Sequence, residues 1–156
     1  MKILITGGKT ATALKLIKAF DNAEIILGDY GDMPNINTNI YSFAELGNWN
    51  TEVLAHNLLT KCLDNGVDVL LPLYEAEIIA LSKSMVLFDE FGLKVLLPES
   101  PQLIQGKFKD WCIFDDGKLV YSSIEIELNK CANLNGFYSF GNENKDFELI
   151  SIPNPS

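Results

Sequence analysis

The sequence predicts an α/β protein in which a parallel sheet, covered by helices on both faces, is followed by a C-terminal antiparallel β-hairpin extension. Over the first two thirds, short apolar runs alternate with segments of helical periodicity, an order that favours a parallel sheet. Beyond about residue 110 the pattern changes to alternating residues around an Asp-Gly pair, which is typical of antiparallel strands. We therefore expect an α/β domain over residues 1–110 and an extension over residues 111–156, packed on or beside it.

The first strand and helix follow from residue spacing. Residues 3–5 are a continuous apolar run that ends at Gly7-Gly8, as expected for a buried strand entering a tight turn. The next segment places apolar side chains three and four residues apart, which predicts a helix with one apolar face. These side chains are Ala13, Leu16, Ile17 and Phe20.

The rest of the first domain repeats this alternation. Glycines follow the helical segments and prolines follow two of the strands, so each element has a recognisable end. The predicted strands lie at residues 25–27, 40–43, 67–71 and 93–97, and the predicted helices at residues 49–63 and 78–88.

The extension is predicted to begin with a hairpin, because Asp116-Gly117 is a favoured two-residue turn after the apolar residues 111–114. Strict alternation over residues 120–128 predicts a long strand, and residues 137–140 and 147–152 are further strand candidates. One face of the long strand would carry Glu125, Glu127 and Asn129. Such a row could hold Mg²⁺, but a solvated outer face is the favoured interpretation.

Charge limits the classes of partner. The 156 residues contain 12 Lys+Arg and 21 Asp+Glu, a formal net charge of −9, which argues against nucleic acid or an anionic membrane as a partner. No apolar run approaches the ~20 residues of a membrane span, and the first residues are too few for the core of a signal peptide. The 3 cysteines show no disulfide or zinc-ligand spacing. We expect a cytoplasmic protein.

The segment from Gly7 to Thr10 is the first candidate site. A phosphate-binding P-loop would need a further glycine at position 3, where Ile3 stands, and the adjacent glycines do not fit G-x-G-x-x-G. A strand that turns into a helix still presents backbone N–H groups to an anion or a polar ligand. Gly7, Gly8, Lys9 and Thr10 are therefore candidate binding residues; the alternative is that the glycines simply form the turn.

Acidic residues follow two of the predicted strands. Asp29 stands where dinucleotide-binding folds place an acid for a ribose hydroxyl, although it could equally begin the turn into Gly31. In the loop after Pro72, Tyr74 could stack on or donate to a ligand. Of the two acids beside it, we assign Glu75 to the site and Glu77 to capping of the helix.

Residues 1–110 resemble the N-terminal, pre-ATP-grasp domain of ATP-grasp ligases of the carbamoyl-phosphate-synthase-like group. The resemblance rests on the order and spacing of several short motifs rather than on one specific motif. These motifs are Lys2-Ile3-Leu4-Ile5-Thr6-Gly7-Gly8, Leu27-Gly28-Asp29, Asn65-Gly66-Val67-Asp68-Val69-Leu70-Leu71-Pro72, the acids Glu75 and Glu77, and Val95-Leu96-Leu97-Pro98.

The resemblance implies a Rossmann-like sheet and a cleft for the acceptor substrate lined by Gly7, Gly8 and Glu75. Lys107 matches the lysine that begins the nucleotide-binding part of the family, whereas the aspartate beside that lysine is absent here. The ~50 residues after Lys107 are too few for the ATP-binding lobes, given usual domain sizes. ATP and Mg²⁺ would then bind only together with a partner chain.

These observations predict a module that binds a small polar metabolite at the glycine turn, or that forms the substrate half of a split, ATP-dependent carboxylate–amine ligase. On its own the chain is not expected to be a ligase. Two alternatives stay open: a small enzyme that uses NAD or NADP, and an interaction or assembly module. Its protein partner would be an ATP-grasp chain or further copies of itself.

Overall fold

The computed structural model describes residues 1–104, 108–126, 133–141 and 147–155. A five-stranded sheet has the order β3-β2-β1-β4-β5, and all of its strands are parallel. Its central strand is buried on both faces, as the apolar run at residues 3–5 predicts. The strands are β1 (Lys2–Ile5), β2 (Glu24–Asp29), β3 (Tyr41–Glu45), β4 (Val69–Leu71) and β5 (Lys94–Val95).

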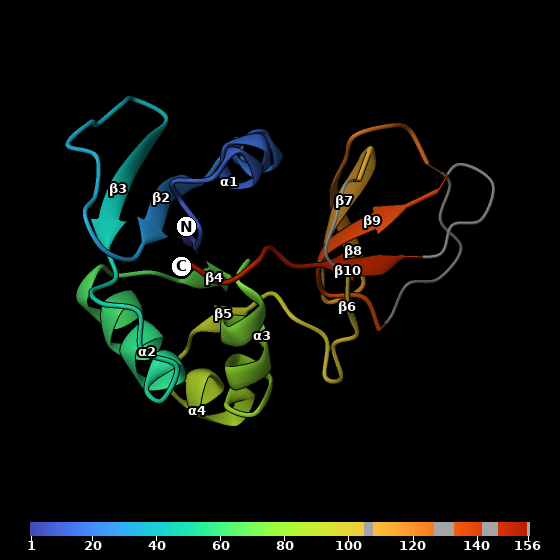
Figure 1. The fold of residues 1–156 in the computed structure, drawn as a ribbon. Helices are drawn as coiled ribbons and strands as arrows, with labels where there is room; N and C mark the ends of the chain where they lie inside the picture. The colour runs from blue at the N-terminus through green and yellow to red at the C-terminus, as the bar shows by residue number, and fades with distance from the viewer. Residues whose placement is uncertain (105–107, 127–132, 142–146, 156) are drawn as a thin grey trace.

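Helices cover both faces of this sheet. On one side lie α2, α3 and α4, and on the other lies α1 (Figure 1). The apolar positions predicted for the first helix point inward, since Ala13 and Leu16 are fully buried. The helices are α1 (Ala11–Leu16), the 3₁₀ turn η1 (Ile17–Ala19), α2 (Leu54–Asp64), α3 (Glu75–Ser82) and α4 (Met85–Glu90). The predicted Rossmann-like α/β arrangement is confirmed.

Two predicted helices have different bounds in the structure. The helix predicted over residues 49–63 begins only at Leu54, because the Asn50 side chain accepts a hydrogen bond from the backbone N of Glu52 and forms a turn instead. The helix predicted over residues 78–88 is two helices. It is interrupted at Ser84, whose hydroxyl donates to the Ala80 carbonyl and so competes with helical continuation.

The second sheet is larger than the predicted hairpin. Its five strands have the order β6-β10-β9-β7-β8, with β6 parallel to β10 and the other pairs antiparallel. The Asp116-Gly117 turn has positive φ at both residues (49° and 84°), which confirms the predicted hairpin. The strands are β6 (Leu103–Ile104), β7 (Asp110–Asp115), β8 (Lys118–Ser122), β9 (Gly136–Phe140) and β10 (Glu148–Ile150).

The long strand predicted over residues 120–128 is wrong for residues 123–126, because β8 ends at Ser122; the last two residues of the predicted strand lie outside the described part of the chain. The neighbouring strand β7 runs antiparallel and begins at Asp110, only just beyond the pair of Cys112 with Ser122. The predicted strand would therefore soon have no further residue of β7 to pair with. Ser123 instead closes the pair, because its hydroxyl oxygen accepts from the backbone N of Trp111 over 2.9 Å. Glu125 is exposed outside the strand, and Glu127 and Asn129 lie outside the described residues.

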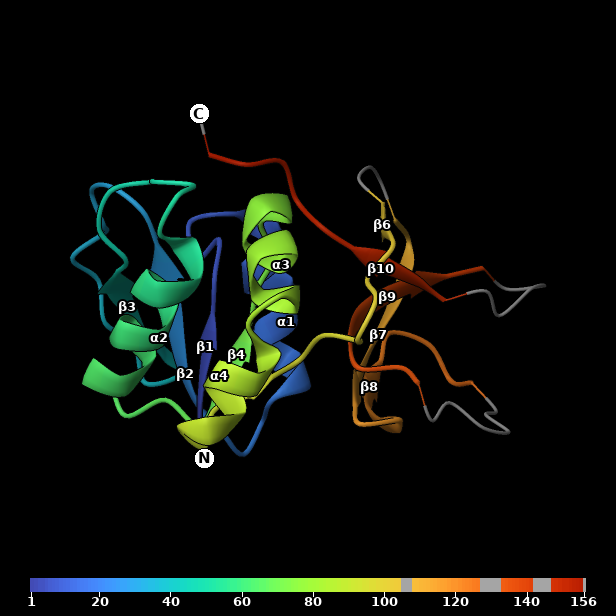
Figure 2. The ribbon, with the colours of Figure 1, turned by 90° about the horizontal axis from the view of Figure 1, so that it is seen from below.

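The two sheets lie side by side, and β5 and the residues just after it make contacts between them. The Lys94 Nζ lies 2.5 Å from Oδ1 of Asp115 on β7, and the Asn135 side-chain amide donates to the Leu97 carbonyl over 3.1 Å. After β10 the chain returns to the first sheet and passes α3 (Figure 2). In the described part of the chain, every helix is too short or too polar to span a bilayer.

Candidate functional site

The carboxyl ends of β1 and β4 meet in the middle of the parallel sheet, at the point where the strand order reverses. Ligands of open α/β sheets bind at this topological switch point. Thr6 follows β1, and its Oγ1 accepts a hydrogen bond from the backbone N of Leu73, after β4, over 2.7 Å. The glycine turn and the loop at residues 74–77 are therefore neighbours, as predicted.

Glu77 is fully buried here and is surrounded by donors. Its Oε1 accepts from the Thr6 hydroxyl over 2.6 Å and from the backbone N of Tyr74 over 3.2 Å. Its Oε2 accepts from the Tyr30 hydroxyl over 2.6 Å. The bond to Tyr74 N is the acidic half of a capping box, so the predicted capping role of Glu77 is confirmed. The other two bonds also tie α3 to the ends of β1 and β2.

Asp29 is the second buried acid at the switch point, 1% exposed. Its Oδ1 accepts from the backbone N of Tyr30 over 2.8 Å and from the Tyr74 hydroxyl over 2.7 Å. Its Oδ2 accepts from the backbone N of Lys9 over 3.0 Å. Both carboxylate oxygens therefore receive donors from the protein itself, and Asp29 fastens the glycine turn to the end of β2.

Three aromatic rings pack together next to these acids. The Tyr30 and Trp49 ring centroids lie 4.9 Å apart and nearly perpendicular, Trp49 and Tyr74 lie 5.5 Å apart, and Tyr30 and Tyr74 lie 6.0 Å apart. The two contacts of Trp49 are edge-to-face and the contact between the tyrosines is tilted; such aromatic pairs add to the stability gained by burial. Together with the two acids and one hydroxyl, the tyrosines form what we call the switch-point network: Thr6, Asp29, Tyr30, Tyr74 and Glu77.

The segment after β10 covers the glycine turn. Ile152 pairs with Tyr74 in a parallel bridge, its backbone N donates to the Leu73 carbonyl over 2.8 Å, and its carbonyl accepts from the backbone N of Glu75 over 3.2 Å. A Cβ added at Gly7 would lie 2.8 Å from Cδ1 of Ile152. The space between the turn and the acidic loop is therefore filled by Ile152 and Leu73 rather than open.

Burial decides the protonation of the network. It raises the pKa of Glu77 to about 7, while the hydrogen bonds from Thr6, Tyr30 and Tyr74 act in the opposite direction and the nearby charge of Asp29 adds to the rise. Burial, together with the neighbouring acids, also raises the pKa of Tyr30 and Tyr74 far above the usual value. Both hydroxyls therefore stay protonated, as hydrogen-bond donors to the carboxylates.

The predicted residues of the glycine turn mostly serve the fold. Gly7 has φ +65°, and Gly8 packs so closely on β2 that an added Cβ would lie 2.7 Å from the Leu27 carbonyl carbon. The Lys9 ammonium donates to the carbonyls of Tyr30 and Asp32, over 2.7 and 3.1 Å. The Thr10 hydroxyl oxygen caps α1, where it accepts from the backbone N of Ala13 over 3.3 Å.

The remaining predicted site residues are placed differently. Asp29 and Tyr74 contact each other, as described, and Glu75 is half-buried at the first position of α3, beside Ile152. Lys107 lies outside the described residues. The structure thus brings Gly7, Asp29 and Tyr74 to one place, but it closes that place with the chain's own side chains.

Sequence reasoning missed Thr6, Tyr30 and Ile152 as members of this region. Thr6 carried a weak signal, as a polar residue between a buried strand and the glycines. Tyr30 stands in a turn-rich segment and Ile152 far along the chain, so no periodicity could place either residue beside Glu77 or Gly7.

The described cysteines and the histidine differ in burial, and none belongs to a group of metal ligands among the described residues. No group of three or more His, Cys, Asp or Glu among them could hold a metal ion. Cys62 and Cys112 are buried, as predicted for ordinary apolar positions, and burial raises the pKa of the Cys62 thiol to about 12. His56 is exposed on α2.

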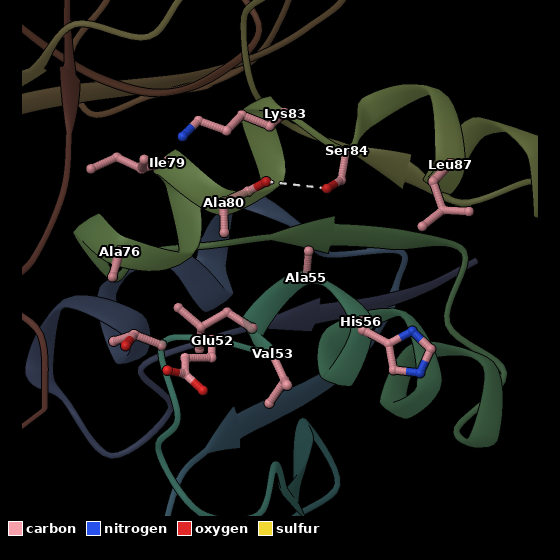
Figure 3. Close-up of a pocket in the computed structure, with 12 residues that line it drawn as sticks. Glu52, Val53, Ala55, His56, Ala76, Ile79, Ala80, Lys83, Ser84 and Leu87 are labelled. Atoms are coloured by element: carbon pink, nitrogen blue, oxygen red, sulfur yellow. Dashed lines mark hydrogen bonds between the residues drawn. The ribbon is translucent and has the colours of Figure 1, made fainter.

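A second concave region lies among the helices on the opposite side of the sheet from α1. This groove of about 640 Å³ is lined by residues from the segment before α2, from α2 itself, and from α3 and α4. Figure 3 shows Ala80 on α3 and Ala55 on α2 pointing toward each other across it. We call it the helical groove. Its lining is mostly apolar, and it lies apart from the switch-point network.

No protein-family model matches this chain, and no curated protein matches it in sequence. The resemblance of residues 1–110 to pre-ATP-grasp domains therefore stays a prediction.

Proposed function

We propose that this chain is a non-catalytic module of the pre-ATP-grasp type, which contributes the acceptor-substrate part of a ligase whose nucleotide site lies on a partner chain. The sheet order and the adjacency of the glycine turn to the loop at residues 74–77 are consistent with that resemblance. One observation carries the non-catalytic part: both buried acids at the switch point, Asp29 and Glu77, are occupied by donors of the protein itself.

A small polar metabolite would reach the glycine turn only after the segment at residues 151–155 moves. Backbone hydrogen bonds of Ile152 hold that segment, as does Asn154, whose Oδ1 accepts from the backbone N of Ala76 at the start of α3 over 2.9 Å. We assign the movement to contact with the partner chain. Substrate binding then requires that the partner chain is bound. This agrees with the observation that Asp29 and Tyr74 are hydrogen-bonded to each other in the isolated chain.

The alternative of an enzyme using NAD or NADP is less well supported. Such an enzyme needs an acid after the second strand that is available to a ribose hydroxyl, whereas Asp29 receives Lys9 N, Tyr30 N and the Tyr74 hydroxyl. Thermal unfolding with NADH, NADPH or ATP·Mg²⁺ tests this. We expect no stabilisation of the isolated chain. A nucleotide at 100 times its Kd would add about 2.7 kcal/mol, and such a shift with NADPH or ATP would overturn the proposal.

The positive test is isolation of the tagged chain from its own cells, with identification of what accompanies it. We expect a protein carrying ATP-grasp lobes in near-stoichiometric amount, and ADP formation with candidate amino or carboxylic acids that requires both chains. Recovery of the chain alone, or only with copies of itself, contradicts the proposal, as does ADP formation by this chain without a partner.

A further inference from the structure

Helix α3 is apolar on two opposite sides, although only one of them faces the sheet. Ile78 and Leu81 are fully buried against the core. Ala76, Ile79 and Ala80 lie on the other side and line the helical groove, where Ile79 is 45% exposed. Glu75 and Ser82 interrupt the apolar character of α3, but its outer side still exposes Ile79. An exposed apolar side chain of this kind, beside a groove, is a candidate contact point for a further protein surface.

The surfaces on either side of α3 extend this apolar character. Val53, before α2, is 46% exposed, and Leu87, on α4, is 38% exposed; both line the groove. Val86 and Phe91 add 75% and 53% exposed apolar side chains at α4. Exposed apolar side chains gathered along one groove are typical of an interaction site.

Two charged residues at the edges of the groove, Lys83 and Glu52, indicate which kind of surface covers it. Lys83 extends from the end of α3, and Glu52 lies on the opposite side, before α2 (Figure 3). Within the described residues, ion pairs are made by Lys2 and Lys94. Neither Lys83 nor Glu52 takes part in one of these ion pairs. A base on one edge and an acid on the other make a surface complementary to itself under two-fold rotation.

We infer that the helical groove is the interface of a symmetric dimer of this chain, in which Ile79 of each copy enters the groove of the other and Lys83 faces Glu52 of the second copy. This inference does not depend on the proposed function. It favours a second copy over an unrelated partner, because a two-fold rotation brings Lys83 of each copy to Glu52 of the other. These two pairs of opposite charges also offset, at the interface, the repulsion that a net charge of −9 produces between copies.

The test is a charge exchange followed by sedimentation equilibrium. We expect the wild-type chain at about 50 µM, well above a micromolar Kd, to have twice its mass of 17.4 kDa. K83E and E52K should each weaken association about tenfold or more, since each places like charges together at two symmetric positions. The double variant K83E/E52K restores opposite charges, and its dimerisation should return towards that of the wild type.

Lys118→Glu is the matched control, because Lys118 is exposed on β8, away from the groove, and the net charge changes as in K83E. It should leave the dimer intact, and I79E should abolish it. A monomeric wild type at this concentration overturns the inference. It is also overturned if the double variant associates as weakly as the single variants while its circular dichroism remains that of the folded protein.

Discussion

The hydroxyl of Tyr74 donates to Oδ1 of Asp29 over 2.7 Å, and this bond joins the loop after β4 to the end of β2 across the carboxyl end of β1. The same oxygen accepts from the backbone N of Tyr30. Because β1 lies between the two joined strands, this bond links its two neighbours at their carboxyl ends, and the other oxygen of Asp29 accepts from the backbone N of Lys9 in the glycine turn. Tyr74 is therefore a structural residue in this conformation, and it is 5% exposed.

Tyr74→Phe is expected to lower the free energy of unfolding by about 1.5–3 kcal/mol, the range for a hydrogen bond to a charged group. The phenyl ring preserves the contacts with Tyr30 and Trp49, so the loss reports the hydroxyl alone. Urea unfolding followed by fluorescence measures it. Tyr121→Phe on β8, outside the switch-point network, is the control and should change stability by less than about 0.5 kcal/mol. Equal effects of the two substitutions would contradict a special role for Tyr74.

The pKa of Glu77 predicts how stability depends on pH. In the folded protein this pKa is raised to about 7 from an ordinary value of 4.5, so between these values the folded state holds a proton that the unfolded chain releases. The free energy of unfolding should therefore decrease as the pH rises from about 4.5 to about 7 and be level above that. The part due to Glu77 is roughly 3 kcal/mol.

Glu77→Gln isolates this contribution, because the amide keeps an acceptor for Thr6 and Tyr74 N but does not titrate. Urea unfolding at intervals between pH 4.5 and 8 should show a decline in the wild type that is largely absent in the variant. Other titrating groups affect both proteins alike, so the difference between the two curves is the measurement. Parallel curves would mean that Glu77 titrates normally and that its burial carries no electrostatic cost.

The sequence predicted the parallel sheet well because its signals are local. A continuous apolar run such as residues 3–5, closed by glycines, reflects burial on both faces of a strand, and helical segments alternate with strands along the first domain. The same locality explains the errors. The break between α3 and α4 at Ser84 depends on one hydroxyl that bonds to the Ala80 carbonyl. The spacing of apolar residues contains no information about such a bond.

The switch-point network was predictable only in part. The neighbourhood of Gly7 and Tyr74 follows from strand order, and the capping role of Glu77 follows from its place in the first turn of a helix. The bond from Tyr30 to Glu77 and the cover by Ile152 join residues far apart in the chain. The bond from Tyr30 depends on how the loop after β2 packs against α3, and the cover by Ile152 depends on how the chain returns from the second sheet. Neither spacing nor composition encodes these two paths.

The contact between Gly7 and Ile152 can be measured by a double-mutant cycle. Gly7→Ala should cost about 1–2 kcal/mol because φ is +65°, and more because its Cβ would meet Cδ1 of Ile152. Ile152→Val removes that atom and alone should cost about 0.5–1.5 kcal/mol. We expect the double variant to lose at least about 0.5 kcal/mol less than the sum, the size of coupling seen between touching residues.

Gly47→Ala supplies the matched control for this cycle. Gly47 also has positive φ, +87°, but a Cβ there would have nothing within 4 Å. Its combination with Ile152→Val should be additive. If the Gly7 cycle were additive as well, Ile152 would not contact the glycine turn. The statement that Ile152 covers the switch point would then be wrong.

The connection between the two sheets yields the last prediction, at Gly136. Its φ is +121°, a conformation essentially restricted to glycine, and an added Cβ would lie 2.7 Å from the Leu96 carbonyl oxygen, just after β5. Backbone cannot yield as a side chain does, so Gly136→Ala should push the second sheet away from the first and cost 3 kcal/mol or more, on the order of a disrupted core position.

Gly92→Ala separates this clash from the general cost of positive φ, because Gly92 has φ +72° and nothing within 4 Å of an added Cβ. It should cost only about 1–2 kcal/mol. Fluorescence of variants that retain either Trp49 or Trp111 follows the two sheets separately, since Trp111 lies on β7. In Gly136→Ala the unfolding transition followed by Trp111 should shift to lower urea concentration more than that followed by Trp49, because Gly136 and Trp111 belong to the second sheet. A cost equal to that of Gly92→Ala would show that Gly136 is not pressed against Leu96 and that the sheets are joined elsewhere.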